Sequence, residues 1–438
     1  MTKSSNSRRR SLRSRIATTA AAAATWASRR TGRGSGGMIG GLIAQKIDPG
    51  ILGQLGGGRP AAIITGTNGK STTTRMLAAA MRAAGDSVAT NEGGDNMDAG
   101  VISALMASPN ADTLVLEVDE LHVAHIAADL KPRVLVMLNL SRDQLDRVGE
   151  INKIERSLRD AVNANPQATV VANCDDPLIA SAVWDAKNVV WVSAGCGWTN
   201  DATSCPRTGG PIIRDGDDWY AVKDLPGGGA FRRPAPAWAI TAEGITTPYG
   251  TTIPLDLALP GDANRGNATL ATAAAVELGA EAVVAASAAE TVDNVAGRYS
   301  TMTVGDHEVR MLLAKNPAGW QEALSMVDRA ADGVVIAVNG HVADGEDLSW
   351  LWDVVFESFG GQTVVASGER GTDLAVRLLY AGIEHRLLHD PLEAIAACPP
   401  GRVEVLANYT AFRDLKKAIE RGAVATAAAA DDERGSHD

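Results

Sequence analysis

The ten residues from Ile63 to Thr72, Ile-Ile-Thr-Gly-Thr-Asn-Gly-Lys-Ser-Thr, join an apolar run to a glycine turn and a Lys-Ser pair. A helix-compatible segment follows from Thr73 to Ala84. Backbone N–H groups in such a turn and the positive end of the following helix bind phosphates. Lys70 adds a mobile positive charge, and the hydroxyl of Ser71 is suited to binding Mg²⁺. The stretch therefore predicts a nucleotide-phosphate site.

The glycine spacing of this loop is shorter than in a standard P-loop. Ile64 stands where the first glycine would fall, five residues before Gly69. A glycine turn without a ligand is the alternative, but the agreement of strand, turn, Lys-Ser pair and helix favours the nucleotide site. The residues predicted to hold the nucleotide are Gly66, Thr67, Asn68, Gly69, Lys70, Ser71 and Thr72.

A second polar cluster ends the apolar run that begins at Leu114, where Glu117, Asp119 and Glu120 fall together. A carboxylate at a strand end beside a phosphate loop is what a second magnesium ligand requires. Glu117 is the predicted ligand, with Ser71 as its partner, and the alternative is a cap or a solvated acid. Lys70 and Glu117 are the predicted catalytic residues of this site.

Further polar residues follow the next apolar strand and begin a later helix. Asn139, Arg142 and Asp143 occur where that strand emerges and predict a substrate-binding edge, with surface salt bridges as the alternative. Asn264 and Asn267 stand three residues apart at a helix start. Residues three apart lie on one face of a helix, so the two amides are predicted to be neighbours.

These residues need strands and helices to position them. Short apolar runs alternate with helix-length segments from residue 60 onward, which predicts a mostly parallel sheet with helices on both faces. Such sheets bind ligands at the carboxyl ends of their strands, where the polar clusters fall. The predicted strands are Ala61–Thr65, Ser87–Thr90, Thr113–Val118, Arg133–Asn139, Thr169–Asn173 and Val189–Val192.

The rest of the chain predicts an insertion and a second α/β domain. Residues 195–258 are rich in Gly, Pro and Trp and predict an irregular insertion. The predicted strands of the second, Rossmann-like domain are Val309–Leu313, Gly333–Val338, Gln362–Ala366 and Val403–Leu406. The expected division is a basic arm and helix (1–50), a central ATP-binding domain (51–300), a C-terminal α/β domain (301–425) and a disordered tail (426–438).

Composition limits the class of protein. The 438 residues are 45% hydrophobic and 21% charged, as in ordinary globular proteins, and the net charge of −11 argues against nucleic-acid binding. No run approaches the roughly 20 apolar residues of a membrane span. The four cysteines show no Cys-x-x-Cys spacing, which argues against a disulfide framework and favours a cytoplasmic protein.

The N-terminal segment is strongly basic. Five arginines precede the alanine run Ala20–Ala24, and no acidic residue occurs before Asp48. An export signal has a similar start, but the apolar region is weak and an ATP site argues against export. An arm that touches anionic lipid headgroups or an acidic partner is one interpretation, and a solvated arm is another.

The glycine loop, the acidic strand end and the Gly-x-x-Asn-x-x-Asn-Ala run from Gly261 resemble the Mur ligase family. These enzymes use ATP to convert a carboxylate into an acyl phosphate, which an amine then attacks. The resemblance implies a central ATPase domain, ATP and Mg²⁺ as cofactors, and nucleotide contacts from Asn264, Asn267 and Arg298. An enzyme that adds an amino acid, like the other Mur ligases or folylpolyglutamate synthase, is the alternative within this family.

Four phrases resemble the MurT branch, the ligase subunits of lipid II isoglutaminyl synthase. They begin at Asn91, Asn139, Leu313 and Ala343. The resemblance implies that ammonia amidates the α-carboxylate of D-glutamate in the stem peptide of lipid II, at the inner face of the membrane. It also implies that a GatD-type glutaminase subunit supplies the ammonia, and that Asn96 helps to bind the substrate.

In this branch an aspartate of the Asp-Gly-x-Asp-x-Ser-Trp motif completes the glutaminase Cys-His pair. That residue is Asp347 here, and Asp344 and Asp353 are nearby alternatives. A carboxylate in this role orients the imidazole and stabilises the imidazolium that forms during acyl transfer.

The chain departs from the MurT pattern in its insertion. Members of this branch commonly carry a zinc ribbon with four cysteines there, but only Cys205 remains, and Thr208 replaces the second ligand. One thiolate cannot make a tetrahedral zinc site, so the ribbon is predicted to be metal-free and held by Trp198, Trp219, Tyr220 and Phe231.

The absence of lysine between Lys153 and Lys187 is a second observation that bears on the acceptor. Amino-acid-adding Mur ligases often carry a carbamoylated lysine in this region. Its absence weakens the amino-acid alternative and agrees with ammonia as the acceptor.

Overall fold

The computed structural model describes residues 11–30, 38–91, 95–142, 151–293, 299–358 and 362–435, without the side chains of Arg29 and of residues 423–435. The chain forms two compact units. The first contains residues 1–141 and 150–293, and the second contains residues 142–149 and 294–438.

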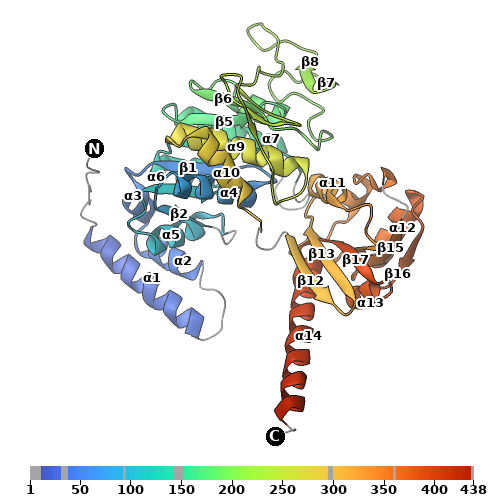
Figure 1. Ribbon diagram of the computed structural model, residues 1–438. Helices are drawn as coiled ribbons and strands as arrows, with labels where there is room; N and C mark the ends of the chain where they lie inside the picture. The colour runs from blue at the N-terminus through green and yellow to red at the C-terminus, as the bar shows by residue number, and fades with distance from the viewer. Residues whose placement is uncertain are drawn as a thin grey trace. The chain divides into compact units, whose positions relative to one another are not determined.

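The first unit is built on a nine-stranded sheet with the order β11-β10-β9-β6-β5-β4-β1-β3-β2 (Figure 1). The six strands from β6 to β2 are parallel. They are β1 (Ala61–Thr65), β2 (Val88–Thr90), β3 (Thr113–Glu117), β4 (Val134–Met137), β5 (Thr169–Asn173) and β6 (Val189–Ser193). Strand β1 lies between β3 and β4, so the strand order reverses around it, and α/β sheets bind ligands at such a point.

Helices cover both faces of this sheet (Figure 1). On one face α4 (Lys70–Ala83), α9 (Asp262–Leu278) and α10 (Ala282–Glu290) pack together. The layer on the other face contains α3 (Ile51–Gly56), α5 (Asp98–Ala107), α6 (Val123–Leu130), α7 (Ile151–Ala164) and α8 (Pro177–Val183). Two N-terminal helices, α1 (Leu12–Arg30) and α2 (Ile39–Ile47), pack against each other, and α2 also packs against α5.

The insertion contains more regular structure than its composition predicts. A hairpin forms a separate two-stranded sheet from β7 (Ile212–Asp215) and β8 (Asp218–Ala221). Three further strands extend the main sheet: β9 (Trp238–Thr241), β10 (Gly244–Thr246) and β11 (Thr252–Pro254). These strands have only three or four residues each, too few for an alternating pattern to be recognised in the sequence.

The second unit has a six-stranded sheet with the order β12-β13-β17-β14-β15-β16. Its strands are β12 (Tyr299–Val304), β13 (His307–Leu313), β14 (Gly333–Ala337), β15 (Thr363–Ser367), β16 (His385–Leu387) and β17 (Gly401–Ala407). All neighbours are parallel except β12, which is antiparallel to β13 at the edge. This arrangement and that of the first unit confirm the predicted α/β class with two parallel sheets.

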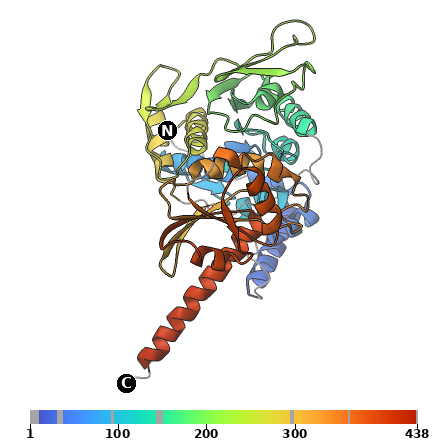
Figure 2. The ribbon, with the colours of Figure 1, turned by 90° about the vertical axis from the view of Figure 1, so that its right-hand side faces the viewer.

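Apolar side chains cover both faces of this second sheet. The elements on one face are α11 (Pro317–Met326), α12 (Gly371–Tyr380) and two short 3₁₀ helices, η1 (Ser349–Trp352) and η2 (Phe356–Ser358). The other face carries α13 (Pro391–Ala396) and the start of α14 (Tyr409–Gly435). Beyond the sheet, α14 continues as one helix through much of the segment predicted to be disordered (Figures 1 and 2), since its alanine run favours a helix. None of the described helices is both long and apolar enough to cross a membrane.

Candidate functional site

The predicted phosphate loop connects β1 to α4. All five residues of β1 are buried, and Gly66 and Gly69 follow with φ values of +138° and +84°. These positive φ values favour glycine. A Cβ on Gly69 would lie 2.6 Å from Oδ1 of Asn267, so a side chain there would also collide with α9.

Lys70 is the first residue of α4, and its side chain folds back over the loop. Its Nζ donates to the carbonyl oxygens of Gly66 (2.6 Å) and Thr67 (3.3 Å) and lies 3.4 Å from the carboxylate of Glu120. Lys70 is only 7% exposed. An ammonium at the N-terminal end of a 14-residue helix suits phosphate, although Glu120 partly offsets its charge here.

Hydrogen bonds join the phosphate loop to the segment after β4. The Thr67 N–H donates to the carbonyl of Asn139 (2.9 Å), and the Ser141 N–H donates to the Thr67 hydroxyl (2.9 Å). The Asn139 amide accepts from the Asn68 N–H (2.9 Å) and donates to the Asn68 carbonyl (3.0 Å). Because both ends of this amide contact the loop, Asn139 positions the phosphate loop, and its predicted contact with substrate has no support in these bonds.

Glu117 ends β3, beside β1, and is 3% exposed. Its N–H donates to Oδ1 of Asn91 (2.9 Å), and the Asn96 amide lies 3.4 Å from its carboxylate. A buried carboxylate with so few neighbouring donors is suited to a cation. Ser71, in the first turn of α4, supplies a partly exposed hydroxyl at the same end of the sheet.

Asn264 and Asn267 lie on one face of α9, as predicted from their spacing. The Asn267 amide is 3.4 Å from Oδ1 of Asn264, and the Asn264 amide donates to the Pro260 carbonyl (2.6 Å). Both residues are at least nine-tenths buried, and Asn267 borders the phosphate loop at Gly69. Two elements far apart in the sequence thus line one polar site.

Arg298 and Asp143 lie outside the described residues. Arg142 belongs to the second unit, where its guanidinium lies 3.2 Å from the carboxylate of Asp353. The sequence reasoning gave no role to Glu120, Asn91 and Ser141, which hold Lys70, Glu117 and Thr67. Of these three residues, Glu120 could have been singled out from the sequence, because it is the third acid at the end of that strand.

In the second unit, Asp347 follows β14 at the carboxyl edge of the sheet. The Ser349 N–H donates to its carboxylate (2.8 Å), and this bond holds the pKa of Asp347 below its usual value. The side chain is otherwise exposed to solvent.

The two alternatives to Asp347, Asp344 and Asp353, are bound to other side chains of this protein. Asp344 is 8% exposed, and its carboxylate accepts bonds from the backbone N–H (2.8 Å) and the hydroxyl of Thr410. Asp353 pairs with Arg142. Asp347 is therefore the acid of the three that is most accessible to another protein.

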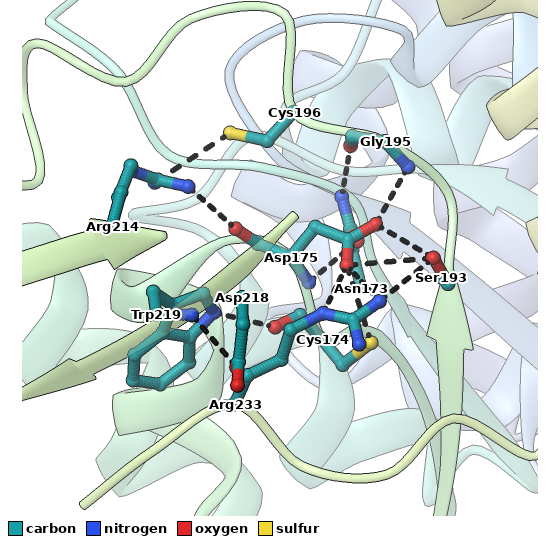
Figure 3. A network of polar contacts seen from close by, with 10 residues as sticks. All are labelled: Asn173, Cys174, Asp175, Ser193, Gly195, Cys196, Arg214, Asp218, Trp219 and Arg233. Atoms are coloured by element: carbon teal, nitrogen blue, oxygen red, sulfur yellow. Dashed lines mark hydrogen bonds and ion pairs between the residues drawn. The ribbon is translucent and has the colours of Figure 1, made fainter. Parts of the chain in front are cut away.

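The insertion is attached to the first sheet by a polar network (Figure 3). Arg233 lies 2.6 Å from the carboxylate of Asp175, which also accepts from the Gly195 N–H (2.7 Å). The Trp219 indole donates to the Cys174 carbonyl (2.9 Å). The base of the insertion is thus fixed by an ion pair and hydrogen bonds.

Aromatic packing holds the rest of the insertion. Trp219 and Phe231 are fully buried with their ring centroids 5.1 Å apart, and Cys205 packs in the same cluster. Tyr220 is 40% exposed, so the prediction that it helps to hold the ribbon was wrong, because side chains alternate along β8. Trp198 bonds locally to Asp201 (2.7 Å).

All four cysteines are free thiols, and Cys174, Cys205 and Cys398 are buried. Within the described ranges no three His, Cys, Asp or Glu side chains converge on a metal position. Burial raises the pKa of Cys174, and it raises that of Cys196 to about 12.

We expect purified protein to contain much less than one zinc per chain and to keep its thermal unfolding midpoint in a chelator. Arg233→Ala should lower that midpoint, because it leaves Asp175 buried without its guanidinium, at a cost of up to about 3 kcal/mol. Arg232→Ala, at an exposed neighbouring position, is the matched control. Metal analysis and calorimetry test both points, and stoichiometric zinc would contradict the metal-free ribbon.

Comparison with known proteins agrees with this geometry. Residues 64–203 match the Mur ligase middle domain, and residues 313–412 match the MurT ligase C-terminal domain. Among solved structures, a pseudomurein peptide ligase type C from Methanothermus fervidus is similar, with a TM-score of 0.65, 17% identity and coverage of 83% of this chain and 79% of that one. The MurF ligase of Thermotoga maritima, solved in complex with ADP, has a TM-score of 0.58, 15% identity and coverage of 83% and 80%. The fold and the phosphate loop define an ATP-dependent ligase of the Mur type.

Curated relatives narrow this class. The lipid II isoglutaminyl synthase (glutamine-hydrolyzing) subunit MurT of Streptococcus pneumoniae is 29% identical over 421 residues, 89% of this chain and 93% of the relative. The subunit of the same name from Staphylococcus aureus strain COL is 27% identical over 417 residues, 90% of this chain and 95% of the relative. The chain is therefore similar to MurT subunits along about nine-tenths of its length.

Proposed function

We propose that this chain is the ligase subunit of a lipid II isoglutaminyl synthase. It uses ATP to phosphorylate the α-carboxylate of D-glutamate in the stem peptide, and ammonia displaces the phosphate to give D-isoglutamine. The main support is the site at the carboxyl ends of the strands where the strand order reverses. It contains the buried ammonium of Lys70, the buried carboxylate of Glu117 and the phosphate loop bound by Asn139. The similarity to MurT over nine-tenths of the chain is the second support.

The phosphate loop fits ATP with magnesium. Lys70 and the N–H groups at the start of α4 face the phosphates, and Asn264 and Asn267 contact the nucleotide. Ser71 and Glu117 hold Mg²⁺, which usually takes one or two protein carboxylates and completes its shell with water and phosphate oxygens. Among the described residues no three acids converge on one position, which is compatible with this coordination of magnesium. When bound, the metal neutralises phosphate charge during transfer. We assign Arg298 to the nucleotide and Asn96, Arg142 and Asp143 to the stem peptide.

A glutaminase of the GatD type supplies the ammonia, and Asp347 contacts its catalytic histidine. The exposed carboxylate of Asp347, held by Ser349, is suited to orient an imidazole on another chain. Asp344 is already bound within its own unit, which favours Asp347 over it.

An exposed apolar patch on the second unit, which also carries Asp347, supports docking of this partner there. The patch consists of Trp352, Val355, Val376, Leu379 and Tyr380, each between 44% and 74% exposed. The rings of Trp352 and Tyr380 lie 5.4 Å apart, and Arg377 stacks 5.5 Å below Trp352 while donating to the Val354 carbonyl (2.7 Å). Trp, Tyr and Arg dominate the binding energy of many protein interfaces.

We expect Leu379→Asp to weaken binding of the glutaminase by about tenfold or more, since it places a charge in an apolar contact. Turnover with glutamine should fall at limiting partner concentration, and turnover with ammonium should not change. Val283→Asp, at an exposed apolar residue of α10 in the first unit, is the matched control. Calorimetric titration measures the affinity, and equal affinities for both variants would contradict this docking surface.

The acceptor distinguishes the proposed reaction from its alternative. A Mur ligase that adds an amino acid would hydrolyse ATP with an amino acid present and not with ammonium. The chain, co-purified with its glutaminase, is therefore assayed with lipid II, ATP and either nitrogen source or a set of amino acids. Phosphate release and a mass change that corresponds to one amide are expected only with glutamine or ammonium. The lipid-linked substrate puts the reaction at the inner leaflet of the cytoplasmic membrane.

A further inference from the structure

Helix α1 is fixed to the first unit by one of its faces. Ala17 and Ala21 are fully buried, and α2 approaches so closely that a Cβ on Gly40 would lie 2.4 Å from the Thr25 hydroxyl. The Ser11 N–H also donates to the Gln54 side chain (3.2 Å) on α3. The orientation of α1 on this unit is thus set by packing, and its other face is presented to solvent.

The outward face of α1 is apolar. Leu12, Ile16 and Trp26 are 73%, 55% and 65% exposed. With Thr19 and Ala23, which are also exposed, they follow spacings of three and four residues and form one stripe along the helix. Such a stripe of large apolar side chains on the outside of a unit indicates an interaction surface.

The stripe is bordered by positive charge. Arg13, Arg15 and Arg30 are exposed, and the Arg30 guanidinium lies 5.6 Å from the ring centroid of Trp26. Residues 1–47 contain ten of the 41 lysines and arginines and none of the 52 acids, so this segment carries +10 and the remainder −21. The chain therefore concentrates cations where it exposes its apolar stripe.

We propose that α1 docks the protein on an anionic phospholipid surface. A helix that carries Leu, Ile and Trp on one stripe with flanking arginines lies in the plane of the interface, with apolar side chains among the acyl chains and guanidinium groups at the phosphates. Tryptophan favours this depth because its ring is apolar and its N–H is polar. Charge complementarity favours the lipid over a contact between the α1 segments of two copies, because two segments of +10 repel each other.

This docking deepens the proposed function, because it brings the ligase to a lipid-linked substrate, but its test needs no catalysis. The full chain is sedimented with vesicles of phosphatidylcholine containing 30% phosphatidylglycerol, and with vesicles of phosphatidylcholine alone. Binding is expected only to the anionic vesicles, with a loss at high salt. Arg15→Glu with Arg30→Glu should weaken it about tenfold or more, since each cation at the surface contributes about 1 kcal/mol.

The apolar contribution has its own variants. The double variant Ile16→Ser with Trp26→Ser should lower vesicle binding about tenfold. The single variant Trp26→Phe keeps a large apolar side chain and should retain most of the binding. Tyr249→Ser, at a residue that is 95% exposed in the turn between β10 and β11, is the matched control and should bind like the native chain. Circular dichroism and the unfolding midpoint check that each variant folds.

The proposal is overturned if the native chain ignores anionic vesicles, or if the α1 variants bind them as well as Tyr249→Ser does. Dimerisation of the native chain that the α1 variants abolish would assign the stripe to a second copy, and binding to an acidic protein instead of vesicles would assign it to that class of partner. Amidation of a lipid-free stem peptide by the α1 variants should equal that of the native chain. If only the α1 variants fail to amidate this peptide, the substitutions damage the enzyme itself. If the native chain also fails to amidate it, the result speaks against the proposed function and leaves the vesicle test unaffected.

Discussion

Replacing Lys70 with alanine is expected to lower ATP-dependent amidation about a thousandfold, because removing one preorganised donor to a developing charge typically costs this much. The ammonium is buried over the phosphate loop, held by the Gly66 and Thr67 carbonyls and by Glu120. No other cation of the described chain occupies the start of α4. Amide formation on lipid II with saturating ammonium, followed by mass spectrometry, measures the effect without the glutaminase.

Lys187→Ala removes an exposed lysine of the same unit and should leave the rate unchanged. Lys70→Arg keeps the charge but is too large for the buried position, so it should recover little activity. Calorimetric titration with ATP separates loss of binding from loss of folding. If Lys70→Ala amidated lipid II at the native rate, the assignment of the phosphate site to this loop would be refuted.

Asp347→Asn is expected to reduce glutamine-driven amidation about 10³- to 10⁴-fold, the loss seen when the carboxylate of a catalytic triad becomes an amide. Turnover with ammonium should remain native, because Asp347 is not among the residues proposed to bind ATP, Mg²⁺ or the stem peptide. The amide can still accept the bond from the Ser349 N–H, so the local turn should persist. Comparing the two nitrogen sources in one preparation gives the ratio directly.

Two neighbouring variants test whether the effect belongs to Asp347. Asp353→Asn should keep most glutamine-driven turnover. Asp344→Asn weakens the bonds to Thr410 at the start of α14, so it should lower the unfolding midpoint and affect both nitrogen sources alike. If Asp347→Asn reduced both activities equally, its role in the glutaminase would be refuted.

The sequence predicted ten strands of the two sheets, because each is a short apolar run bounded by turn residues. It did not predict β9, β10, β11, β12 and β16. It could not predict how loops from different strands interlock. Asn139 was interpreted as a substrate contact from its position at a strand end, but its amide pairs with the backbone of Asn68, 71 residues away. Such pairing depends on strand order, and β1 lies beside β4 only because the order reverses there.

The solvent exposure of individual side chains could not be predicted from the sequence either. Asp344 and Asp347 share one motif, and only the fold distinguishes the buried carboxylate bound to Thr410 from the accessible one. In the insertion, composition indicated aromatic packing, but the alternation along β8 buries Trp219 and exposes Tyr220. The first distinction arises from a tertiary contact, and the second from side-chain alternation in a strand that was not predicted from the sequence.

The bonds between the phosphate loop and the segment after β4 have a thermodynamic consequence. Thr67, Asn68, Asn139 and Ser141 form one hydrogen-bonded cluster. It joins the loop proposed to bind ATP to the segment that leads to Arg142 and Asp143, which are proposed to bind the stem peptide. A ligand that orders this cluster lowers the entropic cost for the next ligand to bind. Linkage is reciprocal, so ATP and the stem peptide should each raise the affinity for the other by the same factor. The concentrations of ATP and of the stem peptide, and not the structure of the protein, would then decide which of the two binds first.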